Sequence, residues 1–441
     1  MRIHKGAGGG IRFRPEEMIS VLIIMFFAVQ GAIVGIAPNV ALDTNLAPPT
    51  TLMKVGGIAS QALIYGAIAA LCVRRWKLVQ RGLPAVTLVL LLAGWVLCST
   101  LWSADPLLTA RRAPEFVLAG MFGIYLTLRF SMARQLRIFW WAMVLLAIGT
   151  VMVAYWLPAY GLDLSAGHLA DWKGVFTQKN ACGRIMVLAT AVLLAGRRWG
   201  WAQLASGALF VLVLVKSGSR SAWALEAVLL AGAGMFFLLR ASERRIRGAL
   251  LGVMALIWST VSVLVFVFRD ALMEMMGRST TLSGRVDIWH AVWPFVMKRP
   301  WLGWGYEAFW RGWTGPSLQV SAAVHFLVFH AHNGYLDLWL QTGIVGLALF
   351  VAAYGRAWLR VLRRVGRGQM EDLLWPVCVL VIVGLYGLDE NTVLVPNGLF
   401  WMMFVMAAVW LEGAWVQLRL EADRKSREAA LDYAESAAAA G

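Results

Sequence analysis

Apolar residues run through this chain in long stretches that short polar segments separate. About twelve of these stretches are long enough, or nearly so, to cross the roughly 30 Å hydrocarbon core of a bilayer as helices. The pattern therefore predicts an all-α integral membrane protein, because helices satisfy every backbone polar group inside the bilayer. The predicted segments are 18–38, 55–73, 83–102, 113–130, 136–157, 180–196, 200–216, 221–239, 246–268, 333–354, 373–388 and 395–415.

The polar stretches are very unequal in length, and they predict how the chain is organised. We expect a cytoplasmic N-terminus at 1–17, membrane helices one to nine within 18–268, and a large periplasmic loop at 269–332. Helices ten to twelve then fall within 333–415, and a cytoplasmic tail follows at 416–441. A loop of that length without secondary structure is uncommon, so the large loop is expected to carry short helices and a function.

Within the large loop, the segment GRVDIWHAVWPFVMKRP (284–300) has the spacing of a short amphipathic helix. Trp-rich apolar faces of this kind lie favourably at a membrane interface, and we expect this face to do so. Its apolar residues recur three and four positions apart, at Val286, Trp289, Val292, Trp293 and Val296.

Composition and charge limit the classes of protein to which this chain can belong. The chain has 60% hydrophobic residues, 23 Trp and a mean hydropathy of +0.68, values that exclude a soluble domain of this size. A net charge of +16 raises the question of nucleic acid binding. The basic residues instead gather in alternate loops, at 74–81, 240–247 and 355–367. This bias places both termini in the cytoplasm beside anionic membrane lipids, and no nucleic acid partner is expected.

Neither a cleaved leader nor a metal framework is expected. The first apolar segment is too long for the core of a signal peptide and is interpreted as a retained helix. All four cysteines fall inside predicted helices without metal-ligand spacing, which argues against a disulfide framework or a zinc site. They are Cys72, Cys98, Cys182 and Cys378.

Basic residues in the outer turns are candidates for binding an anion. Ser219 and Arg220 lie in the turn KSGSRS (216–221), where free backbone N–H groups and a planar guanidinium suit a phosphate or diphosphate. The alternative is that Arg220 is a snorkelling interface residue. In the large loop Arg285 is a second candidate, while Arg278 and Arg269 are weaker ones.

Two further segments offer polar groups. In GVFTQKNACG (174–183), Lys179 and Asn180 stand at an expected helix start, where the helix dipole favours an anion. The alternative is that this segment only positions a loop over a membrane helix. In WSADPLLTARRAPE (102–115), the Asp-Pro turn and its arginine pair either cap a helix or reach the same anionic site. The sequence leaves both alternatives open.

The segment HNGYLDLWLQTGIVG (332–346) is the most informative one for chemistry. His332 is the leading candidate for an acid or base, ahead of His325 and His330, because an imidazole titrates near neutral pH. His290 falls on the amphipathic helix instead. The glycines at 343 and 346 remove side chains from an expected membrane helix, so that another segment can approach its backbone closely.

Together these motifs resemble the O-antigen ligase family of membrane glycosyltransferases. The resemblance runs from about residue 100 to 350, and it implies a twelve-helix bundle with a periplasmic loop carrying short helices. It also implies the transfer of a glycan from a polyprenyl (undecaprenyl) diphosphate carrier to an acceptor hydroxyl. The motifs are WSxDP at 102–106, GVFxxKN at 174–180, SGSR at 217–220, GR…W…RPWLGWG across 284–305, and His332-Asn333 with its Gly-x-x-Gly.

The resemblance implies a role for each candidate residue. Arg220 and Arg285 stabilise the leaving diphosphate, and His332 draws the proton from the acceptor hydroxyl. A single displacement of this kind inverts the anomeric centre, and neither a metal nor a cofactor is expected. Further contacts to the substrate are assigned to Lys179, Asn180, Ser219, Arg278 and Asn333.

Three functions remain open at this point. The first is a polymerase of exopolysaccharide or O-antigen repeat units in the bacterial inner membrane, which GVFTQKNACG favours because it is similar to exopolysaccharide polymerase members of the family. A co-polymerase partner is expected under that hypothesis. The second is a ligase that joins the finished glycan to lipid A-core. The third is a transporter or flippase, which internal repeats would favour.

Overall fold

The computed structural model of this chain is almost entirely helical. One short hairpin breaks the pattern, in which β1 (Leu162–Asp163) pairs antiparallel with β2 (Asp171–Trp172). The all-α prediction is therefore confirmed for the part of the chain that the structure describes. That part comprises residues 14–29, 51–163, 170–196, 200–243, 245–250, 252, 284–312, 314–391, 393–395 and 398–413.

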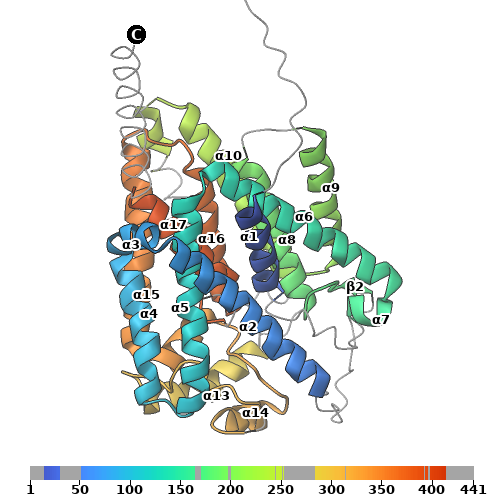
Figure 1. The fold of residues 1–441 in the computed structure, drawn as a ribbon, viewed down its shortest axis with the longest axis vertical. Helices are drawn as coiled ribbons and strands as arrows, with labels where there is room; N and C mark the ends of the chain where they lie inside the picture. Colours follow the sequence, from blue (N-terminus) through green and yellow to red (C-terminus); the bar gives the residue numbers. More distant parts are fainter. Residues whose placement is uncertain are drawn as a thin grey trace, which may run out of the picture. The chain divides into compact units, whose positions relative to one another are not determined.

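The chain divides into two compact units, Met1–Arg74 with Met132–Trp223, and Arg75–Ser131 with Ala224–Gly441. The helices of the first unit are α1 (Pro15–Ala28), α2 (Thr51–Arg74), α6 (Met132–Trp156), α7 (Pro158–Gly161), α8 (Lys179–Ala195) and α9 (Trp201–Lys216) (Figure 1). Helix α10 (Arg220–Ala241) begins in the first unit and continues in the second. The second unit holds α3 (Trp76–Gly82), η2 (Leu83–Val86), α4 (Thr87–Cys98), η3 (Ser99–Leu101), α5 (Pro106–Arg129), α13 (Arg285–Lys298), α14 (Ser317–Val324), α15 (Gly334–Gly366), α16 (Leu374–Asp389) and α17 (Leu399–Leu411).

In the first unit, α6 packs against α1, α8 and α9. A polar contact also joins α6 to α1, because Arg137 places one terminal nitrogen 3.1 Å from both carboxylate oxygens of Glu17. The Glu17 side chain is only 1% exposed. A carboxylate buried to this degree needs such a partner, so the pair fixes how α1 sits on α6.

In the second unit, α17 packs between α5 and α16. Trp401 is fully buried, stacks on Phe116 with ring centroids 4.2 Å apart, and donates its indole N–H to the Phe116 carbonyl. Close approach depends on glycine, because a Cβ at Gly123 would meet the carbonyl oxygen of Met402 at 2.6 Å. Small residues of this kind let apolar helices pack by contact alone.

Five described helices are long and apolar enough to cross a membrane, which makes this a helical, multi-pass membrane protein. They are Val55–Arg74, Trp76–Leu101, Met132–Trp156, Arg220–Ala241 and Gly334–Gly366, and shorter apolar helices follow at Trp201–Lys216, Leu374–Asp389 and Leu399–Leu411. The expected total of about twelve spans stays a prediction. Most of the segment predicted at 246–268 lies outside the described residues.

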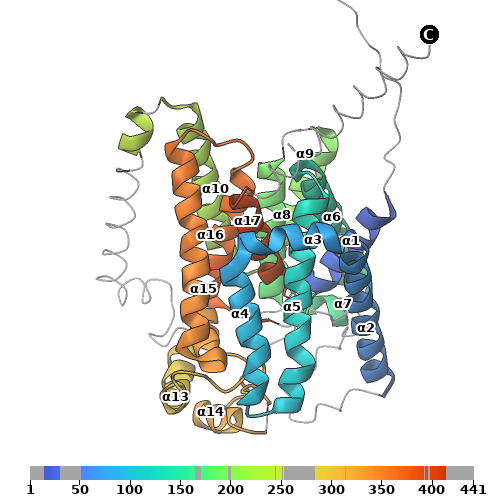
Figure 2. The same ribbon diagram turned by 60° about the vertical axis from the view of Figure 1, so that its left-hand side comes forward.

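The described part of the segment between α10 and α15 contains the short helices α13 and α14, whereas a periplasmic loop at 269–332 stays a prediction. Figure 2 shows α13 and α14 at the end of the second unit where α4 is followed by α5 and where α15 begins. The helix expected at 284–300 is confirmed as α13, but its buried face differs from the predicted one. Ile288, Val292 and Val296 pack into a protein core that includes Trp304, whereas Trp293 is 47% exposed. The loop after α13 covers its aliphatic side, so that side does not face a membrane interface.

Candidate active site

The loop RPWLGWG (299–305) lies directly against α15 where that helix is kinked. Gly343 has φ +71° and ψ −179°, a conformation that only glycine adopts readily. A Cβ at Gly343 would overlap the carbonyl oxygen of Trp301. The Ile344 N–H then donates to the Pro300 carbonyl at 2.8 Å. The predicted close approach of another segment to this glycine is therefore confirmed.

The WSADP turn joins the same assembly. Asp105 caps α5 by accepting from the Leu108 N–H at 3.1 Å, and it pairs with Arg311 at 3.2 Å. The Ala104 N–H donates to the Trp304 carbonyl at 2.8 Å. Of the two alternatives left open for this turn, the structure places Asp105 in the helix-capping one.

His332 lies in a constrained turn immediately before α15. Its φ of +48° is unusual for a residue with a side chain. Asn333 is the N-cap of α15, and its side-chain oxygen accepts from the N–H groups of Tyr335 and Leu336, both at 3.1 Å. The oxygen of Asn333 is thus used in capping, and its assignment to substrate stays a prediction.

A buried carboxylate holds the turn from the other side. Asp337 is fully buried and accepts from the Ala331 N–H with both oxygens, at 3.1 and 3.2 Å. The indole N–H of Trp310 donates to the same carboxylate at 2.7 Å, and that of Trp289 donates to the Ala331 carbonyl at 2.8 Å. The residue just before His332 is therefore fixed through both its backbone donor and its acceptor.

His332 faces a second buried carboxylate, that of Glu390, which is 2% exposed. The Nδ1 atom of His332 lies 3.3 Å from Oε1 of Glu390, and Nε2 of His330 lies 3.6 Å from Oε2. The His332 N–H donates to Nδ1 of His330 at 3.2 Å, so a neutral His330 ring carries its proton on Nε2. An Nδ1–H of His332 donating to Glu390 leaves the lone pair of Nε2 available for a substrate.

Arg285 completes this cluster at the first residue of α13. Its guanidinium pairs with Asp389 through one terminal nitrogen and lies 3.7 Å from Oε1 of Glu390 through the other. The helices α13 and α16 thus meet at the start of α15. One guanidinium faces two carboxylates, so the cluster carries a net charge of −1 while both imidazoles are neutral.

The same residues form a donor set that suits a metal ion. One donor atom from each of His330, His332 and Glu390 lies within 4.8 Å of the others. Two imidazoles and one carboxylate are ligands that zinc accepts. The guanidinium of Arg285 is 3.7 Å from the same Glu390 carboxylate, and its charge opposes a cation there. The expectation of a site without metal stays a prediction.

A further layer of polar groups lies behind the turn. Glu307 has φ +62°, and its N–H donates to the side-chain oxygen of Gln341 at 2.8 Å. Burial raises the pKa of Glu307 to about 8, against the opposing effect of the Arg112 charge. Arg112 itself pairs with Glu115 at 3.1 Å. Burial therefore favours the neutral, protonated form of the Glu307 carboxyl.

In the first unit, two of the predicted motifs come together. The Ser219 hydroxyl donates to the side-chain oxygen of Asn180 at 3.0 Å, and the ammonium of Lys179 pairs with Asp171 at 2.7 Å. Gly218 has φ +59°, and a Cβ there would overlap the Asp171 carboxylate. The SGSR turn and the GVFTQKN segment thus form one polar cluster, although their contacts with a substrate stay a prediction.

The other candidates are placed as follows. Arg220 is exposed at the first residue of α10, and His290 and His325 are both exposed. Arg278 and Arg269 lie outside the described residues. Exposure at a helix start leaves the Arg220 guanidinium accessible to an anion.

Comparison with known proteins shows a family to which part of this chain is similar. Residues 205–351 match the family model described as O-antigen ligase. Part of this chain is therefore similar to the O-antigen ligase family. Arg220, Arg285 and His332 lie inside the matched region, whereas Lys179 and Glu390 lie outside it.

Two curated proteins are similar to parts of this chain. The exopolysaccharide production protein ExoQ of Rhizobium meliloti (strain 1021) is 25% identical over 215 residues, which are 44% of this chain and 47% of ExoQ. A Rickettsia prowazekii (strain Madrid E) protein that bears the name of a polysaccharide ligase is 37% identical over 81 residues, 18% of this chain and 20% of that protein. The chain thus spans less than half the length of either relative in these matches.

The carboxylates beside His332 are the residues that sequence reasoning missed. Asp389 and Glu390 end an apolar segment in YGLDEN (386–391), and Glu390 lies 58 positions from His332. Adjacent acidic residues at the end of an apolar segment are the signal that the sequence offered. Asp337 was hidden inside the apolar run LDLWL (336–340), where a charged residue needs a buried partner.

Proposed function

We propose that this protein is a membrane glycosyltransferase of the O-antigen ligase type. It moves a glycan from a polyprenyl (undecaprenyl) diphosphate carrier to an acceptor sugar hydroxyl at the periplasmic face of the inner membrane. The observation that carries the proposal is the His332–Glu390 pair, with Arg285 beside it, at the start of α15. Helix α15 begins inside the region that matches the family model. An imidazole oriented by a carboxylate is the arrangement that general-base catalysis requires.

The reaction is a single displacement at the anomeric carbon. Nε2 of His332 takes the proton from the acceptor hydroxyl, while Glu390 stabilises the resulting imidazolium through Nδ1. The acceptor oxygen forms a bond to the anomeric carbon as the bond from that carbon to the carrier diphosphate breaks. The carrier leaves as its diphosphate and the anomeric centre is inverted.

The guanidiniums of Arg285 and Arg220 are assigned to the leaving diphosphate, without a metal. Negative charge grows on that group as the bond breaks, and fixed N–H donors stabilise it. Arg285 carries five N–H donors, and its contacts with Asp389 and Glu390 use its two terminal nitrogens. These carboxylates hold its guanidinium beside His332, where the bond breaks.

Polymerisation of exopolysaccharide or O-antigen repeat units is the favoured reaction. The name of ExoQ supports it, and that match is the longer of the two. The second candidate is ligation of the finished glycan to lipid A-core, which the family description and the name of the Rickettsia relative support. Within the second unit the histidines and Arg285 gather at one end of the bundle, which favours a transferase over a transporter that lines a path through the bilayer.

A gene deletion separates these functions. The deletion strain is complemented with the wild type, with His332→Ala, or with His290→Ala as an exposed-histidine control, and surface glycans are resolved by size. Loss of long exopolysaccharide with single repeat units remaining, in the deletion and with His332→Ala only, supports the polymerase. Lipopolysaccharide that stops at the bare core, with polymer still made, identifies the ligase. Normal glycans in the deletion strain contradict both.

A further inference from the structure

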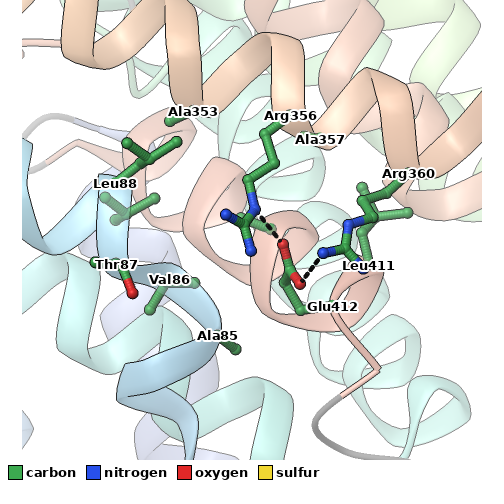
Figure 3. Close-up of a pocket in the computed structure, with 12 residues that line it drawn as sticks. Ala85, Val86, Thr87, Leu88, Ala353, Arg356, Ala357, Arg360, Leu411 and Glu412 are labelled. Atoms are coloured by element: carbon green, nitrogen blue, oxygen red, sulfur yellow. Dashed lines mark hydrogen bonds and ion pairs between the residues drawn. The ribbon is translucent and has the colours of Figure 1, made fainter.

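An open recess lies in the second unit, among the end of η2, the first turn of α4, the second half of α15 and the end of α17. Its apolar lining comes mainly from small and branched side chains, and Thr87 adds a hydroxyl. Figure 3 shows two arginines and one glutamate at this recess, all drawn together on the side of α15 and α17. The lining residues are Ala85–Val89, Ala353, Arg356, Ala357, Arg360, Ala408, Leu411 and Glu412.

The charges at the recess do not balance. Nε of Arg356 lies 2.6 Å from one oxygen of Glu412, and a terminal nitrogen of Arg360 lies 2.8 Å from the other. One carboxylate therefore serves two guanidiniums, which leaves a net charge of +1. The Arg356 and Arg360 side chains are 48% and 34% exposed, whereas Glu412 is 12% exposed. Each guanidinium has five N–H donors, so most of them remain for an incoming anion.

The position along α15 places this recess near a membrane interface. The part of α15 after its kink, residues 344–366, is ~34 Å long at 1.5 Å per residue, enough to cross a core of about 30 Å. Arg356 and Arg360 lie in the last three turns of that helix, away from the end that carries His332. The exposed Leu359 and Leu362 on the same turns suit lipid chains. Basic residues so placed reach the headgroup region by snorkelling.

We propose that this recess binds the phosphate headgroup of an anionic glycerophospholipid. The guanidiniums of Arg356 and Arg360 contact the phosphate oxygens, because a planar fork of donors matches a phosphate in geometry and charge. The acyl chains lie along the apolar surface that α4 and α15 expose. Glu412 competes with the lipid for both guanidiniums and holds them in place between α15 and α17 when no lipid is bound.

The test is a lipid titration of the purified full-length protein, in which native mass spectrometry measures the bound lipid. The probes are phosphatidylglycerol, zwitterionic phosphatidylethanolamine and inorganic phosphate. The double variant Arg356→Gln/Arg360→Gln is compared with Arg363→Gln/Arg367→Gln, which removes the same charge from exposed positions of the same helix region outside the recess. We expect the first double variant to lose about tenfold or more in phosphatidylglycerol affinity, and the second about twofold or less.

A third variant keeps the test informative if the arginine variants fold poorly. Glu412→Gln removes the competing carboxylate and leaves both arginines in place, so phosphatidylglycerol affinity is expected to rise about tenfold. Unchanged or weaker binding to Glu412→Gln overturns the proposal and leaves the three residues as a clamp between α15 and α17. Equal losses in the two arginine pairs also overturn it, because they indicate unspecific surface charge. Binding of inorganic phosphate as tightly as the lipid overturns the lipid as the occupant.

Discussion

The two ends of α15 present opposite charge environments. At its start, one guanidinium faces two carboxylates beside a pair of imidazoles, and the excess is negative. In its last turns, two guanidiniums share one carboxylate, and the excess is positive. The first arrangement places surplus negative charge beside the proposed base, and the second favours binding an anion. The surplus charge in each cluster, rather than the presence of ion pairs, decides what that cluster can do.

The largest expected effect is the loss of His332. His332→Ala removes the proposed base, and we expect transfer to fall by about a hundredfold to ten-thousandfold. The measurement is the rate of glycan transfer per amount of protein in the membrane. His290→Ala, an exposed histidine on α13, is the control and is expected to keep the wild-type rate. Full activity of His332→Ala would show that His332 is not the base of the transfer reaction.

Replacing Gly343 tests whether the kink sets up the cluster. Gly343→Ala places a Cβ against the carbonyl oxygen of Trp301 in a backbone conformation that alanine disfavours. The expected cost is about 1 to 3 kcal/mol or more, seen as a lower melting temperature together with reduced transfer.

The control for that variant is Gly355→Ala on the same helix, where a Cβ meets nothing within 4 Å. It is expected to keep or raise the melting temperature, because alanine favours helix more than glycine by about 1 kcal/mol. Equal melting temperatures for the two variants would contradict the structural account of the kink.

Glu390→Gln removes one negative charge from the cluster at the start of α15 and keeps the shape of the side chain. Without the carboxylate, His332 loses its orienting partner and the stabilisation of its charged form, so transfer is expected to fall about a hundredfold. The rate is compared with that of Glu371→Gln, an exposed position just before α16. A rate for Glu390→Gln equal to that of the control would show that the surplus carboxylate does not assist the base.

The smallest effect concerns Glu307. Its raised pKa means that the folded protein holds a proton that the unfolded chain releases above the ordinary value of 4.5, so stability falls as pH rises from about 5 through 8. Glu307→Gln stays neutral at every pH. We therefore expect its melting temperature to exceed that of the wild type at pH 9 by about 2 to 4 °C and to match it near pH 5. An identical pH dependence in both proteins would contradict the burial of an ionisable Glu307.

The local pattern of apolar residues predicts much of the fold, but it does not predict which side chains pair within the site. The apolar runs predicted the helices, and the spacing of 284–300 predicted α13. The buried face of α13 was predicted wrongly in part, since only the covering loop that contains Trp304 decides which side faces protein. The partners Asn180 and Ser219 are 39 positions apart, and His332 and Glu390 are 58 apart. Contacts between distant segments leave no periodic signal, so the sequence identified His332, Asn180 and Ser219 but neither Glu390 nor these pairings.

Reconstituted glycan transfer tests whether His332 is the base of a metal-independent transferase. Purified protein in lipid nanodiscs is given an undecaprenyl diphosphate-linked repeat unit in the presence of EDTA, and the release of undecaprenyl diphosphate is followed together with product size. We predict release coupled to longer glycan for the wild type, and loss of both for His332→Ala. Release that continues unchanged in His332→Ala, or that requires an added metal ion, would contradict the assignment of His332 as the base of a metal-independent transferase.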